Sequence, residues 1–144
     1  MTAVVLDASV AAKWWLPAPS EPLREEALTL LERYANGEIR FIVPDLFWLE
    51  LGNILWKAVR QKRCPRSVAD TAITETRDRN FPTVSSAELL TDAFAIALDF
   101  DRTVYDSVYV ALAVAFSAEL VTADERLANA LASYFPVKWL GAAV

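Results

Sequence analysis

Histidine is absent from this 144-residue chain, and cysteine occurs once, as Cys64. Without histidine, catalytic Ser-His-Asp and Cys-His sites, histidine-ligated zinc and imidazole acid–base chemistry are all excluded. A zinc site built from cysteines is excluded too, because it needs several thiolates. Any chemistry must therefore rely on carboxylates, hydroxyls, Lys, Arg or Tyr. A bound metal would be a hard, oxygen-preferring cation such as Mg2+ or Mn2+.

Other scarcities limit the class of protein. A lone cysteine allows no internal disulfide, which fits a reducing cytoplasm. No apolar run reaches the roughly 18 residues that span a bilayer, and no basic segment precedes the first apolar residues as in a signal peptide. We therefore expect a cytoplasmic protein without membrane association. With 55% hydrophobic residues and only three glycines, the composition predicts a single globular domain over residues 1–144.

The first nine residues combine a short apolar run with a carboxylate. Val4 and Val5 favour an extended strand, and a strand that is apolar at consecutive positions is typical of a buried parallel sheet. Asp7 follows directly, at the carboxyl end of this strand, where open α/β sheets bind their ligands. The alternative interpretation is that Asp7 or Ser9 only caps the next helix.

Strand and helix patterns alternate along the rest of the chain, with little hairpin signal. This alternation predicts an α/β fold with three layers, in which helices flank a central, mostly parallel twisted sheet. Further strands are expected at 39–43, 119–122 and 137–140, and residues 80–84 are expected to form a linker or a short strand. Helices are expected at about 9–16, 20–35, 45–62, 67–79, 86–98, 106–116 and 125–133, with Ser20 capping the second of these and Asp106 introducing the sixth.

Three more acidic residues occupy unusual positions. Glu50 lies among the apolar residues of its helix, with Asn53 one turn later, and a carboxylate there is costly to bury unless something neutralises it. Asp106 begins a helix that is apolar nearly all round, and Asp124 follows a strand as Asp7 does. Each has a structural alternative: Glu50 can reach water, Asp106 can be an N-cap, and Thr122 fits a capping box.

Together with Asp7, these acids suggest one acidic cluster. Like charges about 4 Å apart repel by about 4 kcal/mol at an effective dielectric constant near 20, so clustered carboxylates must bind cations or protons. One or two Mg2+ or Mn2+ ions in such a cluster suit the hydrolysis of a phosphodiester bond. That chemistry needs neither histidine nor a covalent nucleophile.

A basic stretch stands out in a chain whose net charge is −5. Five cationic residues fall within ten positions that contain no acid: Lys57, Arg60, Lys62, Arg63 and Arg66. The net charge argues against nucleic-acid binding over the whole surface. The stretch is interpreted either as a rim that contacts RNA phosphates or as a solvated helix end.

Four segments resemble, in order, the motifs of PIN domains. These are residues 4–9 around Asp7, residues 48–55 around Glu50, residues 105–113 (Tyr-Asp-Ser-Val-Tyr-Val-Ala-Leu-Ala) and residues 120–127 (Leu-Val-Thr-Ala-Asp-Glu-Arg-Leu). The last two are the most specific. The resemblance covers essentially the whole chain and is strongest to the VapC toxins of prokaryotic toxin–antitoxin pairs. Residues 64–84 match no motif.

This resemblance implies a divalent-metal-dependent endoribonuclease whose catalytic and metal-binding acids are Asp7, Glu50, Asp106 and Asp124. It also implies an RNA substrate, a homodimer and a cognate, VapB-like antitoxin protein. Three further residues match positions that would support the acids: Ser9, Asn53 and Thr122. A PIN-like module that binds RNA or protein without catalysis is the alternative. A phosphatase-type α/β enzyme ranks lower, because Ser9 stands where its second Asp would be.

Overall fold

A parallel sheet of five strands, in the order β3-β2-β1-β4-β5, forms the centre of the computed structural model. The structure describes residues 2–17 and 21–143. The strands are β1 (Thr2–Leu6), β2 (Ile39–Pro44), β3 (Thr83–Val84), β4 (Glu119–Thr122) and β5 (Val137–Trp139). The predicted strands are thus confirmed, except that β5 ends one residue before Leu140. Of the two possibilities for residues 80–84, the short strand is the one that forms, as β3 at the edge of the sheet.

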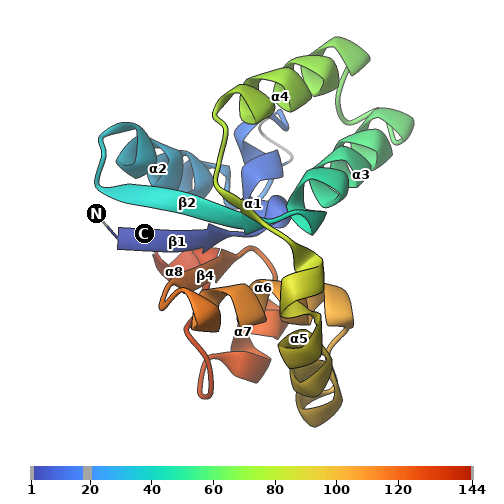
Figure 1. Cartoon of the computed structure of the whole chain (residues 1–144). Coiled ribbons are helices and arrows are strands. Elements are labelled where there is room, and N and C mark those ends of the chain that lie inside the picture. Colours follow the sequence, from blue (N-terminus) through green and yellow to red (C-terminus); the bar gives the residue numbers. More distant parts are fainter. Residues whose placement is uncertain (1, 18–20, 144) are drawn as a thin grey trace.

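Helices cover both faces of this sheet, so the predicted three-layer α/β/α fold is confirmed (Figure 1). Helices α1 to α4 lie above the sheet in Figure 1, and α5, α6 and α7 lie below it. The bounds are α1 (Ala8–Ala11), the 3-10 turn η1 (Ala12–Trp14), α2 (Arg24–Ala35), α3 (Leu46–Arg60), α4 (Arg66–Asp78), α5 (Ser86–Phe100), α6 (Val104–Ala115), α7 (Glu125–Leu131) and α8 (Leu140–Ala143).

Apolar burial explains this layering. Val5 and Leu6 of β1 are fully buried, as expected for a strand with helices on both sides. Helix α6 is buried from Ser107 to Ala113 without a break and packs against β1, β2 and β4, so it is the central buried helix that its composition predicts. No helix among the described residues is both long and apolar enough to cross a membrane.

The strand order creates a switch point between β1 and β4. From β1 the strands are added outward in the order β2, β3, with the connecting helices above the sheet in Figure 1. The chain then returns through α5 and α6, below the sheet, to β4 on the other side of β1 (Figure 1). The connections that leave β1 and β4 therefore diverge, and a crevice is expected at the carboxyl ends of these two strands. Asp7 follows β1 and Asp124 lies two residues beyond β4, so both belong to this edge.

Two predicted helix starts are wrong. Helix α6 begins at Val104 rather than at Asp106, because the Thr103 side chain is its N-cap and accepts a hydrogen bond from the Asp106 amide at 3.0 Å. The Asp106 carboxylate is thereby released from capping. The predicted cap at Ser20 lies outside the described residues; the helix it was expected to introduce begins at Arg24.

Candidate active site

Asp7 is held at the switch point by one group from the neighbouring strand β4 and one from helix α1. The Thr122 hydroxyl, at the end of β4, donates a hydrogen bond to Asp7 Oδ2 at 2.7 Å. The Ser9 amide donates to Asp7 Oδ1 at 3.3 Å, so Asp7 also caps the short helix α1. The predicted capping by Asp7 is therefore confirmed, but it uses only one carboxylate oxygen, and the end of strand β4 orients the other.

Asp124 is positioned by the same two segments. The Thr122 hydroxyl accepts a hydrogen bond from the Asp124 amide at 3.1 Å, while Ser9 Oγ accepts one from the Ala123 amide at 3.2 Å. Asp124 itself, not Thr122, caps α7, since its Oδ1 accepts from the Leu127 amide. The residues expected to support the acids, Ser9 and Thr122, thus tie the loop after β4 to the loop after β1.

Glu50, on α3, is oriented by a residue of α6, the helix on the other side of the sheet (Figure 1). The hydroxyl of Tyr109, on α6, donates a hydrogen bond of 2.6 Å to Glu50 Oε1, on α3. Tyr109 is only 2% exposed, whereas Glu50 is half-buried, so a buried hydroxyl of α6 orients a carboxylate of α3 that reaches solvent. Sequence reasoning missed Tyr109 as a functional residue. The sequence feature that could have identified Tyr109 is its hydroxyl group, about one turn after Asp106 in a mostly apolar helix.

The charges of the four acids are coupled. Burial raises the pKa of Asp7, and the Asp106 charge raises it further against hydrogen bonds from Thr122 and Ser9 that lower it. Burial likewise raises the pKa of Glu50, with the charges of Asp7 and Asp106 adding to the effect. Burial and the charge of Asp124 raise the pKa of Asp106. Tyr109 lies in the same field: burial, then Asp7 and Glu50, raise its pKa.

The charges of these acids influence one another, but their side chains do not form a compact set of metal ligands. Throughout residues 2–17 and 21–143, no three Asp, Glu, His or Cys side chains gather as metal ligands do, which differs from the single tight cluster expected from the sequence. The donor set nevertheless fits a hard divalent cation, because it consists of carboxylate oxygens, and the ionised forms of Asp7, Glu50 and Asp106 are costly where they stand.

The predicted basic residues follow one another from the last turn of α3 to the start of α4. Lys57 and Arg60 occupy the last turn of α3, Lys62 and Arg63 follow it, and Arg66 begins α4; all five are exposed. The Arg60 guanidinium lies over the ring of Trp56, 5.1 Å from its centre. With a rise of about 1.5 Å per residue, Lys57 is about 10 Å along α3 from Glu50.

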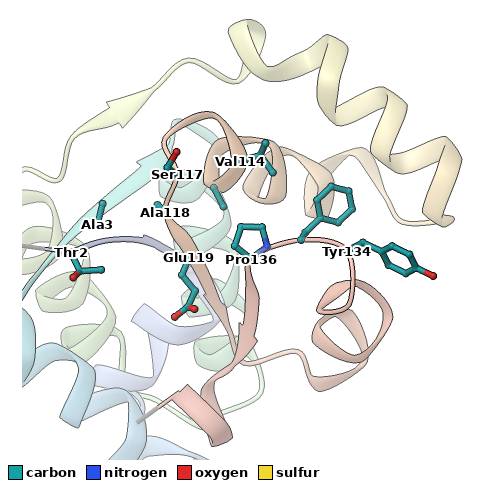
Figure 2. A pocket seen from close by; sticks show the side chains of 10 residues that line it. Thr2, Ala3, Val114, Ser117, Ala118, Glu119, Tyr134 and Pro136 are labelled. Atoms are coloured by element: carbon teal, nitrogen blue, oxygen red, sulfur yellow. The ribbon is translucent and has the colours of Figure 1, made fainter.

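A separate cavity of about 660 Å3 lies at the other end of the strands (Figure 2). Its walls include Thr2 at the start of β1, Glu119 at the start of β4 and the segment 134–136. Glu119, its one acidic residue, is paired with Lys138 at 3.3 Å. This cavity therefore contains none of the coupled acids and is not the candidate active site.

Replacing Asp7 by Asn is expected to stabilise the metal-free protein near neutral pH. A carboxyl whose pKa is raised by folding contributes stability below its unfolded pKa, near 3.8, and loses that contribution as pH rises through its folded pKa. Asn keeps the capping acceptor without the charge. Urea denaturation in EDTA between pH 4 and 8 should show a smaller loss of unfolding free energy for Asp7→Asn than for the parent protein.

The exposed carboxyl of Asp92 on α5 provides the matched control, since Asp92→Asn removes one charge outside the site. If both variants follow the pH profile of the parent, the burial of the Asp7 charge has no energetic consequence.

Comparison with known proteins assigns this arrangement to a family. The PIN domain family model matches residues 4–131, a range that includes all four acids. The chain is 35% identical over 128 residues to Ribonuclease VapC3 of Pyrobaculum aerophilum. The aligned region covers 88% of this chain and 92% of the relative.

Solved structures share the fold. The crystal structure of PAE2754 from Pyrobaculum aerophilum has a TM-score of 0.70 at 20% identity and covers 97% of this chain and 90% of its own. A toxin–antitoxin complex from Klebsiella pneumoniae contains a chain with a TM-score of 0.62 at 16% identity, which covers 94% of this chain and 95% of its own. The protein therefore belongs to the PIN domain family, and within it resembles the VapC ribonucleases.

Proposed function

We propose that this protein is an endoribonuclease that hydrolyses RNA phosphodiester bonds with the help of Mg2+ or Mn2+, and that it is the toxin of a type II toxin–antitoxin pair. The observation that carries the proposal is the coupling of four acids at the switch point of a PIN fold. The 35% identity to a ribonuclease over most of both chains supports RNA as the substrate.

Asp7, Glu50, Asp106 and Asp124 would hold one or two cations. When bound, such ions activate a water and stabilise the charge that develops on the phosphate and on the leaving oxygen. The chain's own contribution is orientation. Thr122 and the Ser9 amide fix Asp7 from the sheet side, and Tyr109 fixes Glu50 from α6.

The proposed assembly has two protein partners. Helix α5 presents three exposed apolar side chains at helical spacing, Leu90 at 52%, Phe94 at 54% and Leu98 at 68% exposure. Such a stripe on a surface helix favours a protein interface, and we assign it to the homodimer. The cognate antitoxin is proposed from the shared fold with a toxin–antitoxin complex.

Replacing Asp106 by Asn is expected to lower the RNA cleavage rate by about 10²–10³-fold. The variant loses one carboxylate of a set that would hold cations worth several kcal/mol of transition-state stabilisation. Cleavage of a labelled single-stranded RNA should also stop in EDTA and return with added Mn2+ or Mg2+. Asp92→Asn should cleave as the parent does, and circular dichroism should show both variants folded.

Full cleavage by Asp106→Asn would place the active site elsewhere. A folded, antitoxin-free protein that binds RNA but cleaves none with either metal would favour the non-catalytic PIN-like module.

Replacing Tyr109 by Phe is expected to reduce kcat about 10–100-fold, the usual effect of losing a group that orients a metal-binding side chain. The ring stays buried, so the KM for RNA should change little. The readout that separates orientation from mere packing is metal titration: a higher Mn2+ concentration should recover part of the lost rate. Tyr134→Phe, at an exposed ring far from the acids, is the control. An unchanged metal dependence would contradict the role of Tyr109.

Removing two charges of the basic stretch, in Lys57→Gln/Arg60→Gln, is expected to weaken RNA binding and to flatten its salt dependence. Each lost phosphate contact on single-stranded RNA should reduce the slope of log affinity against log salt by about 0.7. Binding is measured in the Asp106→Asn background, so that the RNA stays intact. The double variant Arg40→Gln/Lys138→Gln removes the same charge from exposed strand positions. Equal slopes in both variants would make the basic stretch a solvated helix end.

A further inference from the structure

A cavity of about 280 Å3 opens beside Glu50. Helix α3 supplies most of its wall, and the first turn of α6 supplies the rest. The lining residues are Leu46, Leu49, Glu50, Asn53, Ile54 and Tyr105. This cavity is continuous with the proposed active site, because Glu50 belongs to both and Tyr105 directly precedes Asp106.

The side chains at this cavity are unusually exposed for their type. Tyr105 is 64% exposed and Leu49 is 77% exposed. A larger hollow of about 500 Å3 shares Leu46, Leu49 and Tyr105 and continues along α5 as far as Leu90, where the stripe assigned to the homodimer begins. The exposed ring of Tyr105 and the exposed side chain of Leu49, next to Glu50, indicate a surface that is covered during function.

The chemistry of the lining selects the occupant. None of the six residues is cationic, so the cavity does not suit a phosphate group. The Glu50 carboxylate opposes an acidic peptide side chain. An exposed aromatic ring suits stacking with a base, and the Asn53 amide offers a donor beside an acceptor, as the edge of a nucleobase does. Leucine and isoleucine side chains complete an apolar wall.

We propose that this cavity binds one unstacked nucleobase of the RNA, next to the bond that is cut. Tyr105 stacks on the base, and Asn53 forms hydrogen bonds with its edge and so sets a base preference at that one position. This inference rests on the proposed ribonuclease function and deepens it. It makes Asn53 a residue that determines specificity, beyond its expected role in supporting the acids.

The test is cleavage of a randomised single-stranded RNA pool, with the cut ends mapped by sequencing. The parent protein should show a base preference at one position adjacent to the cut, and Asn53→Ala should flatten the preference at that position only. Tyr105→Leu should lower kcat/KM about tenfold, within the range found for removing a stacked aromatic ring. Tyr105→Phe keeps the ring and should recover most of that loss.

Matched controls come from exposed residues at the other end of the strands. Asn36→Ala removes an exposed amide that follows α2, and Tyr134→Leu removes an equally exposed ring. Neither should change the base preference. An Asn53→Ala profile identical to that of the parent overturns the inference. So does a Tyr105→Leu variant that loses its dimer in sedimentation but keeps its profile, since a second copy of the chain would then cover the cavity.

A binding measurement separates failure of this inference from failure of the proposed function. Fluorescent oligoadenylate, oligocytidylate and oligouridylate are titrated against Asp106→Asn with and without Asn53→Ala. A parent protein that cleaves no RNA overturns the ribonuclease proposal; in that case, affinities that differ between the bases only while Asn53 is present still support the base cavity. Equal affinities for all three oligonucleotides overturn it.

Discussion

The hydrogen bond from Thr122 to Asp7 is the contact on which the rest of the site depends. Asp7 and Thr122 lie 115 positions apart in sequence. They meet because β4 pairs with β1 on the side opposite to β2. A carboxylate at this point loses water on both sides, which raises its pKa. The fold thus buries the charge of Asp7 near those of the other acids, and the hydrogen bond from Thr122 offsets part of the free-energy cost of ionising it.

Glu50 and Asp106 reach this point from helices, whereas Asp7 and Asp124 follow strands, so the acids have different supporting groups. Strand ends fix Asp7 and the amide of Asp124, while Glu50 depends on Tyr109, a residue of the buried helix α6. In this arrangement the charges of the acids influence one another. Hydrogen bonds orient the carboxylates of Asp7 and Glu50, and a hard cation requires such orientation of its ligands.

Much of this could be predicted from the sequence, because apolar runs that end in an acid mark both the strands and the sheet edge. Asp7 and Asp124 were located in this way. The start of α6 could not be, since Thr103 and Asp106 are both good N-caps and only the backbone decides between them. Tyr109 was missed for another reason: its helix is apolar on every side, and periodicity does not reveal which buried hydroxyl meets a carboxylate of another helix.

Helices α3 and α6 build both the acidic site and the cavity beside it. Along α6, Tyr105, Asp106 and Tyr109 are spaced by one and three residues, so they lie within about one turn of each other. Along α3, Glu50 and Asn53 are likewise one turn apart, and the bond between Tyr109 and Glu50 joins the two helices. The distance between a bound base and the proposed cation site is therefore set by helix packing rather than by a mobile loop. A substitution that shifts α3 against α6 must disturb base preference and cleavage together, whereas a change at the exposed tip of Asn53 can alter preference alone.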